Sequence, residues 1–174
     1  MTIEIPLTQG LVALIDEADF DLVSRFKWCA FNGSTGKTYY AQSHIRRDNG
    51  SRTNVYMHRL LFGLTDSRTD VDHIDGDGLN NRRANLRTCS RAENLWNRGA
   101  QANNKSGFKG VTFHKQSRKW RAEIRFNGNY KSLGYFHTPE EAHMAYCAAA
   151  AELHGEFCNF GAMESGQKKG PEGP

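Results

Sequence analysis

The segment of residues 71–94 constrains the fold of this chain more than any other stretch. It opens with a short apolar strand pattern that ends in Asp72 and His73, and a loop rich in Gly, Asp and Asn follows. A second strand pattern begins at Asn85, and the residues around Asn94 suit a helix. The segment therefore offers a carboxylate and an amide to a metal ion, with an imidazole between them.

Asp72, His73 and Asn94 supply the chemistry that hydrolysis of a phosphodiester requires. His73 can accept a proton from water near neutral pH. Asp72 and Asn94 provide oxygen ligands, which suit Mg²⁺ or Mn²⁺ rather than zinc. Such an ion stabilises charge on the scissile phosphate and on the departing 3′ oxygen. Neighbouring residues of an ideal strand point to opposite faces, so a bend must redirect Asp72 or His73 if both are to reach one pocket.

This segment resembles the ββα-metal site of HNH homing endonucleases. His73 matches the first histidine of that signature and Asn85 the central asparagine. Asn94 stands at the third position, which is usually His, as it does in one phage and intron branch of the family. The run Tyr-Met-His-Arg-Leu-Leu at residues 56–61 also matches that branch. The resemblance implies that His73 is the general base, that Asp72 and Asn94 hold the metal, and that Asn85 pins the loop so that His73 is oriented.

Two other interpretations of nearby residues remain to be weighed. His58, in the run before the segment, either supports the site or belongs to the core. An EF-hand loop beginning at Asp70 is excluded, because Ile74 falls at an oxygen-ligand position and Asn81 falls where a bidentate Glu is required.

Basic residues are concentrated in the middle of the chain. Residues 1–81 hold 8 Lys/Arg against 11 Asp/Glu, residues 82–131 hold 13 against 2, and residues 132–174 hold 2 against 6. A block this basic predicts a polyanionic partner, because neutralised phosphates release counterions. Beside a phosphodiesterase-like segment, we expect that partner to be double-stranded DNA. Arg87, Arg91 and Arg98 are candidates for phosphate contacts.

The pattern changes beyond the polar stretch of residues 99–106, which we interpret as a linker. Residues 108–115, 119–126 and 130–136 alternate, with turn residues between them, and so predict a three-stranded antiparallel sheet. Thr138-Pro-Glu-Glu141 then predicts the start of an Ala-rich helix, with Thr as cap and Pro in the first turn.

This second region resembles the plant APETALA/ethylene-response-factor DNA-binding domain. The resemblance rests on Lys109-Gly-Val, Lys-Trp-Arg-Ala-Glu-Ile-Arg at 119–125, Leu-Gly-Tyr-Phe at 133–136 and Thr-Pro-Glu-Glu-Ala at 138–142. It implies a sheet that lies in the major groove with a helix packed behind it. Fusion of such a module to an HNH nuclease is typical of mobile phage and bacterial elements.

Alternation assigns the two faces of this sheet. Apolar side chains such as Val111, Trp120 and Ile124 share the face toward the helix, which leaves polar side chains for DNA. The predicted DNA-binding set is Lys109, Thr112, His114, Arg121, Glu123, Arg125 and Tyr130. Arg and Lys can pair with guanine or phosphate, and Glu with cytosine. The alternative is that these charges only solvate the outer face.

Together these patterns predict an α+β protein with two domains. Residues 1–98 form an HNH nuclease domain with an amino-terminal α+β extension, residues 107–161 a DNA-binding sheet and helix, and residues 162–174 a disordered tail. The four cysteines contain no CxxC pair, so reduced thiols are expected rather than a zinc knuckle. No long apolar run or signal sequence is present, so we expect no membrane association and a location in the bacterial host cytoplasm.

The predicted function is a metal-dependent DNA endonuclease of the homing type, which uses Mg²⁺ or Mn²⁺ and acts as a monomer. Two alternatives stay open: a DNA-binding regulator that carries an inactive nuclease remnant, and a structure-specific or RNA nuclease. One nuclease segment per chain favours nicking of a single strand.

Overall fold

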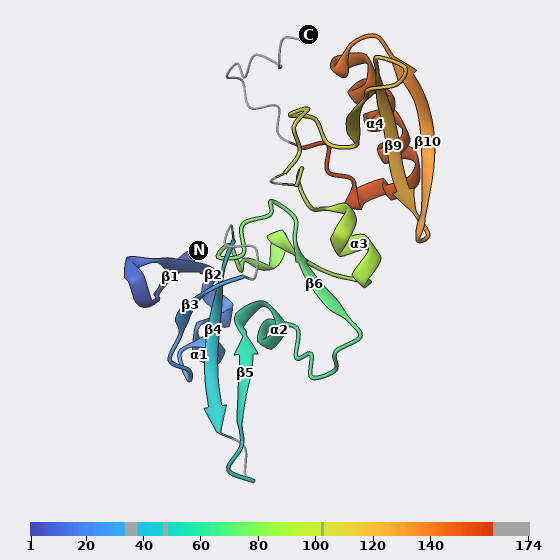
Figure 1. Cartoon of the computed structure of the whole chain (residues 1–174). Coiled ribbons are helices and arrows are strands. Elements are labelled where there is room, and N and C mark those ends of the chain that lie inside the picture. The colour runs from blue at the N-terminus through green and yellow to red at the C-terminus, as the bar shows by residue number, and fades with distance from the viewer. Residues whose placement is uncertain (34–37, 47–48, 102, 162–174) are drawn as a thin grey trace. The chain divides into compact units, whose positions relative to one another are not determined.

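The computed structural model describes residues 1–33, 38–46, 49–101 and 103–161. The chain divides into two compact units, unit 1 from Met1 to Asn94 and unit 2 from Leu95 to Pro174. It is a mixed α/β protein with several small antiparallel sheets and few helices (Figure 1). In the described part of the chain, no helix is both long and apolar enough to cross a bilayer. The predicted tail at 162–174 lies outside the described residues.

Unit 1 is built from three small sheets around one core. β1 pairs with β2, β3 and β5 flank β4, and β6 pairs with β7, all antiparallel. The strands are β1 Thr2–Pro6, β2 Val12–Asp16, β3 Cys29–Asn32, β4 Tyr39–Arg46, β5 Arg52–Tyr56, β6 Asp70–His73 and β7 Leu86–Cys89. The helices are η1 Thr8–Gly10, η2 Glu17–Asp19, α1 Phe20–Val23, α2 Met57–Leu61 and η3 Arg83–Asn85, and α3 Arg91–Trp96 begins here. The core includes Ile15, Met57, Val71 and Leu86.

The amino-terminal residues form a hairpin because the chain reverses at residues 9 and 10. Gln9 and Gly10 both have positive φ angles, 64° and 70°. β1 and β2 are thus the two strands of this hairpin. Asp16, a plausible helix cap by its position, makes no cap hydrogen bond to η2. Its Oδ2 instead accepts a bond of 2.8 Å from the backbone N of Arg83, so Asp16 ties the hairpin to η3.

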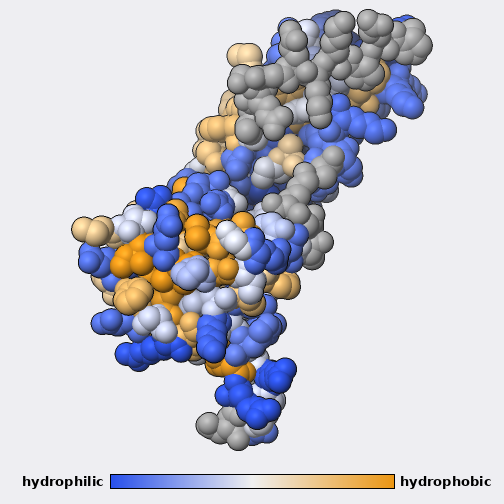
Figure 2. Space-filling model, turned by 90° about the vertical axis from the view of Figure 1, so that its left-hand side faces the viewer, coloured by the Kyte–Doolittle hydropathy of each residue, from blue (hydrophilic) through white to orange (hydrophobic). Residues whose placement is uncertain are grey.

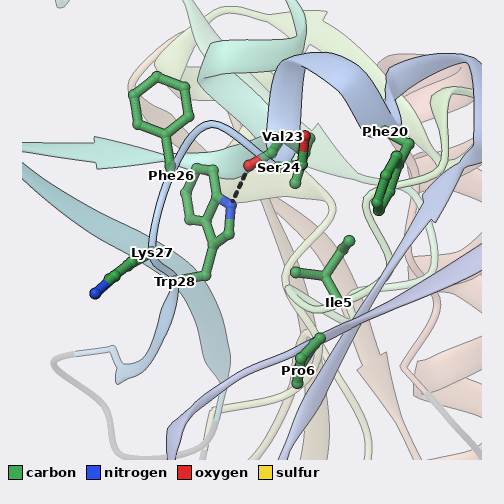
Figure 3. A pocket seen from close by; sticks show the side chains of 8 residues that line it. All are labelled: Ile5, Pro6, Phe20, Val23, Ser24, Phe26, Lys27 and Trp28. Atoms are coloured by element: carbon green, nitrogen blue, oxygen red, sulfur yellow. Dashed lines mark hydrogen bonds between the residues drawn. The ribbon is translucent and has the colours of Figure 1, made fainter.

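Hydrophobic residues reach the surface of unit 1 (Figure 2). An open groove of about 370 Å³ lies between β1, α1 and the turn before β3, and Figure 3 shows its walls. Trp28 closes one side, and its indole Nε1 donates to the carbonyl of Val23 over 2.9 Å. None of the predicted site residues lines this groove.

Unit 2 is a three-stranded sheet with one helix against it. The strand order is β10, β9, β8, and every pairing is antiparallel. The elements are β8 Val111–His114, β9 Lys119–Phe126, β10 Asn129–Phe136, α4 Pro139–His154 and η4 Gly155–Phe157. The predicted capping box is confirmed: Thr138 Oγ1 accepts from the backbone N of Glu141, and the Glu141 carboxylate accepts from the backbone N of Thr138.

Unit 2 begins before the predicted linker. Trp96 stacks on His154, with ring centroids 4.4 Å apart, and Asn159 Nδ2 donates to the carbonyl of Asn97 over 2.7 Å. The sequence placed the boundary after residue 98, whereas contacts divide the chain between Asn94 and Leu95. The difference arises because the last turn of α3 packs within unit 2.

Candidate active site

The loop between β6 and β7 is held by the side chain of Asn85. Its Oδ1 accepts from the backbone N of Asp75 over 3.1 Å, and its Nδ2 donates to the Asp75 carboxylate and to the carbonyl of Asn80. The backbone N of Ile74 donates to the carbonyl of Asn85 over 2.9 Å. These bonds bring the two ends of the loop together directly after His73.

Buried on β6, Asp72 is neutralised by its neighbour on β7. Asp72 pairs in register with Arg87, and Arg87 Nη2 donates to Asp72 Oδ2 over 2.8 Å. Both side chains are largely shielded, with 6% and 14% exposed. Arg87, predicted to contact phosphate, is therefore engaged with the predicted metal ligand.

Asn94 contacts Asp70 on the same face of β6 as Asp72. Asn94 Nδ2 donates to Asp70 Oδ2 over 3.0 Å, and Arg91 Nη1 lies 3.2 Å from the same oxygen. Asp70 is thus an acidic residue of the site that the sequence analysis considered only for calcium. The sequence did carry a signal for Asp70: it lies two residues before Asp72, and residues two apart on a strand share a face.

The donor set around β6 suits a hard cation. Asp70, Asp72 and Asn94 all carry side-chain oxygens, which Mg²⁺ and Mn²⁺ prefer. Across the described ranges, no group of three or more His, Cys, Asp or Glu side chains is gathered closely enough to hold a metal by itself. Any ion would therefore rely on the Asn94 amide or on ligands from substrate and water.

His73 lies on the opposite face of β6, away from bulk solvent. His73 is only 6% exposed. Its ring centroid lies 5.0 Å from that of His58 and 5.9 Å from that of Tyr40. Burial lowers the pKa of His73, although a hydrogen bond to Asn81 and the carboxylate of Asp75 oppose that effect. The imidazole is therefore neutral near pH 7 and can accept a proton.

The ring of His58 lies against that of His73. Burial, with smaller contributions from His73 and Arg59, lowers the pKa of His58 to about 3. The ring stacks on Tyr56 at 5.6 Å, and its buried Nδ1 has no hydrogen-bond partner among the described residues. His58 is thus a neutral side chain packed against His73.

The outer face of the unit 2 sheet carries most of the predicted DNA-binding residues. Arg121 pairs in register with both Thr112 and Tyr135, and Arg125 pairs with Tyr130. The Arg121 and Glu123 side chains form an ion pair of 2.8 Å. The guanidinium of Arg125 lies 5.6 Å from the ring centroid of Tyr130, which is 69% exposed. His114 and Tyr135 rings contact at 5.2 Å.

The predicted DNA-binding set lacks Tyr135 because a β-bulge reverses the alternation of side chains along β10. The register of β10 shifts between Ser132 and Gly134, so Leu133 is the extra residue and Tyr135 joins the outer face. Strict alternation from Ser132 would have sent Tyr135 toward the helix.

Lys109, also predicted to contact DNA, lies outside the strands of this sheet, and its ammonium bonds within unit 2. Its Nζ donates to the carbonyls of Trp96 and Asn159 over 2.7 and 2.9 Å. Burial lowers the pKa of Lys109 to about 8. The ammonium thus joins both ends of unit 2. Arg98 is exposed and lies before the sheet.

Comparison with known proteins finds a family for the β6–β7 region and another for the sheet of unit 2. A family model described as HNH endonuclease matches residues 55–95, and one described as AP2 domain matches residues 106–156. Protein 3.8 of Escherichia phage T7 is 34% identical over 90 residues, which cover 52% of this chain and 74% of that protein. The chain belongs to the HNH endonuclease family. A protein of Acanthamoeba polyphaga mimivirus named as an uncharacterized HNH endonuclease is 29% identical over 154 residues, covering 86% of this chain and 74% of that protein. No solved structure matches the chain.

As an HNH endonuclease, the chain is a nuclease, and its AP2 domain indicates DNA binding. The HNH match spans His58, Asp72, His73, Asn85 and Asn94. The AP2 match spans the whole sheet of unit 2, whereas Arg98 lies outside both. Nucleases of this kind depend in general on a divalent metal ion.

Proposed function

We propose that this HNH endonuclease is a metal-dependent DNA nuclease of the homing type, in which His73 activates the attacking water and unit 2 places the enzyme on double-stranded DNA. The single observation that carries the proposal is the position of His73. A neutral, buried imidazole ends β6 next to Asp72, and Asn85 fixes the loop that follows. A general base for water requires such a neutral imidazole at working pH.

In the proposed reaction, His73 takes a proton from water as the water oxygen bonds to phosphorus. The bond from phosphorus to the 3′ oxygen breaks, and solvent protonates that oxygen. Asn85 keeps the loop in place, so that His73 stays oriented during the reaction. A divalent ion held by Asp72 and Asn94, for which we propose Mg²⁺ or Mn²⁺, would supply charge neutralisation at the phosphate and at the leaving oxygen.

Unit 2 is proposed to bind DNA through the outer face of its sheet. Support comes from the shared face of Thr112, Arg121, Glu123 and Arg125, together with the exposed Tyr130. Arginine reads guanine or phosphate, and an exposed aromatic ring can pack on sugar or base. Arg91 and Arg98 are proposed phosphate contacts, because both are exposed. We propose that the enzyme works as a monomer with one cleavage site, which would nick one strand.

Incubation of the full chain with supercoiled plasmid tests this function. We expect relaxed circles in Mg²⁺ or Mn²⁺, and intact plasmid in a chelator. The His73→Ala variant should cleave about 10²- to 10⁴-fold more slowly while its affinity for DNA changes little. Full-rate cleavage by that variant would rule out His73 as the base.

A second candidate is a DNA-binding regulator with an inactive nuclease remnant. The observation that favours it is that Asp72 is already paired with Arg87 and Asn94 with Asp70, so protein side chains engage both proposed ligands. Under this alternative the plasmid stays intact in every metal, while DNA binding persists. Cleavage of the plasmid by the wild-type chain in Mg²⁺ or Mn²⁺ would therefore rule out this alternative.

A further inference from the structure

Asn81 presents a fully buried amide in the loop between β6 and β7. Its exposure is 0%, and the hairpin at the amino terminus holds its backbone. The backbone N of Asn81 donates to the carbonyl of Leu14 over 2.7 Å, and the backbone N of Leu14 donates to the carbonyl of Leu79 over 2.8 Å. Residues 79–81 therefore lie along β2 in a fixed position.

The orientation of the Asn81 amide follows from one of its hydrogen bonds. Asn81 Nδ2 donates to the carbonyl of Leu79 over 3.1 Å. The reverse orientation would set Oδ1 against that carbonyl, and two acceptors repel. Oδ1 therefore faces the other way, where it lies 3.4 Å from Nε2 of His73.

This contact selects one tautomer of His73. An amide oxygen can only accept, so Nε2 must carry the hydrogen, and the lone pair of the neutral ring is then on Nδ1. Tyr40 and His58 contact the same ring at 5.9 and 5.0 Å and restrict its rotation. The loop also packs closely on Tyr40, because a Cβ on Gly78 would collide with that ring.

We propose that Asn81 is a positioning residue, which holds His73 as the Nε2–H tautomer so that Nδ1 accepts the proton from water. The inference rests on the proposed role of His73 as the base. It gives the amino-terminal hairpin a part in catalysis, since β2 fixes the residues that carry the Asn81 amide.

Nuclear magnetic resonance reads the tautomer directly and without activity. In the full chain with ¹⁵N-labelled histidine, we expect long-range ¹H–¹⁵N spectra at neutral pH to show His73 protonated at Nε2. In the Asn81→Ala variant the two tautomers should mix. A wild-type His73 protonated at Nδ1 would overturn the inference, whether or not His73 proves to be the base.

Kinetics give the second test. Asn81→Ala should lower kcat by roughly 10- to 10²-fold with KM unchanged. Residues that orient a metal ligand from behind have effects of this size, and we expect the same for a residue that orients the base. The same change in a His73→Ala background should cause no further loss, because residues that act as one unit are not additive. A full, additional loss in that background would contradict the inference. If His73→Ala itself cleaves at full rate, the function fails while the tautomer result stands on its own.

Asn80 provides the matched control in the same loop. Its side chain bonds to Asp75 and Arg82, whereas the amide of Asn81 faces His73. Asn80→Ala should leave kcat within about threefold of wild type, because its side chain holds Asp75 and Arg82 rather than the ring of His73. An equal loss of kcat in Asn80→Ala and Asn81→Ala would mean that loop integrity alone matters. Should Asn81→Ala fail to fold, Asn81→Ser retains a donor for Leu79 but cannot reach His73, and the same outcomes apply.

Discussion

Acid should destabilise unit 1 through His58, and the size of the effect can be worked out. The pKa of His58 is about 3 in the folded chain and about 6.5 when exposed. Between these values the unfolded state binds more protons than the folded state, so stability rises with pH and is lost as the pH falls below about 6.5. At about pH 5 the loss is roughly 2 kcal/mol, which is 1.5 pH units at about 1.36 kcal/mol each. At about pH 5 the imidazole of His58 is still neutral in the folded chain. The loss of about 2 kcal/mol is therefore set by the pKa of His58 in the unfolded chain.

The His58→Phe variant should abolish this pH dependence. Phenylalanine keeps a ring against Tyr56 and His73, and it removes a buried nitrogen that has no partner. Relative to wild type, the variant should gain about 2 kcal/mol in its free energy of unfolding as the pH falls from about 7.5 to about 5. His73, whose pKa is also lowered by burial, contributes in both proteins and cancels in the comparison.

Urea unfolding followed by fluorine resonances of 5-fluorotryptophan makes the measurement in the intact chain. Trp28 is the one tryptophan of unit 1, so its signal reports on that unit separately from Trp96 and Trp120. His44→Gln is the control, because His44 is exposed on β4, where its ring bonds to Asn54. A difference between His58→Phe and wild type that stays constant with pH would refute the reasoning.

Three further predictions concern the metal, the DNA face and the extent of unit 2. Asp72→Asn should raise the Mg²⁺ concentration needed for half-maximal plasmid cleavage, with partial rescue by Mn²⁺, which accepts the same oxygen ligands; cleavage at full rate in chelator would contradict it. Arg125→Ala should cost roughly 1–3 kcal/mol in binding if it reads a base, and relax preference at one position in a binding selection. A fragment of residues 95–161 should be more stable to urea than one of residues 104–161 by roughly 2–4 kcal/mol, because the shorter one loses the Trp96 stack and one acceptor of a buried ammonium.

Local features of this chain were predictable from sequence where short-range geometry decides them. The Thr138 capping box and the alternation of β9 depend on residues three or two apart, and the structure shows both. Where one residue breaks the period, the same reasoning fails. The bulge at Leu133 moved Tyr135 to the outer face, and the sequence signal for it is Gly134, because a glycine inside a strand pattern often marks a bulge.

Contacts between distant segments explain the remaining differences. Lys109 is basic and lies in a basic block, which predicted a DNA contact, but the carbonyls that bind it come from residues 13 before and 50 after it in the sequence. Asn81 likewise meets His73 only because β2 holds the loop. No spacing rule reports such pairs, since they follow from how the chain folds back on itself.

The two faces of β6 explain how His73 stays neutral among carboxylates. Asp75, Asp72 and Asp77 each raise its pKa, because a nearby carboxylate favours the charged imidazole. Burial has the larger effect and lowers the pKa overall. Strand alternation makes this possible: Asp72 faces Arg87, which neutralises it, while His73 faces the rings of Tyr40 and His58. A carboxylate paired with Arg87 and a neutral imidazole therefore stand one residue apart on β6 without forming a charged pair.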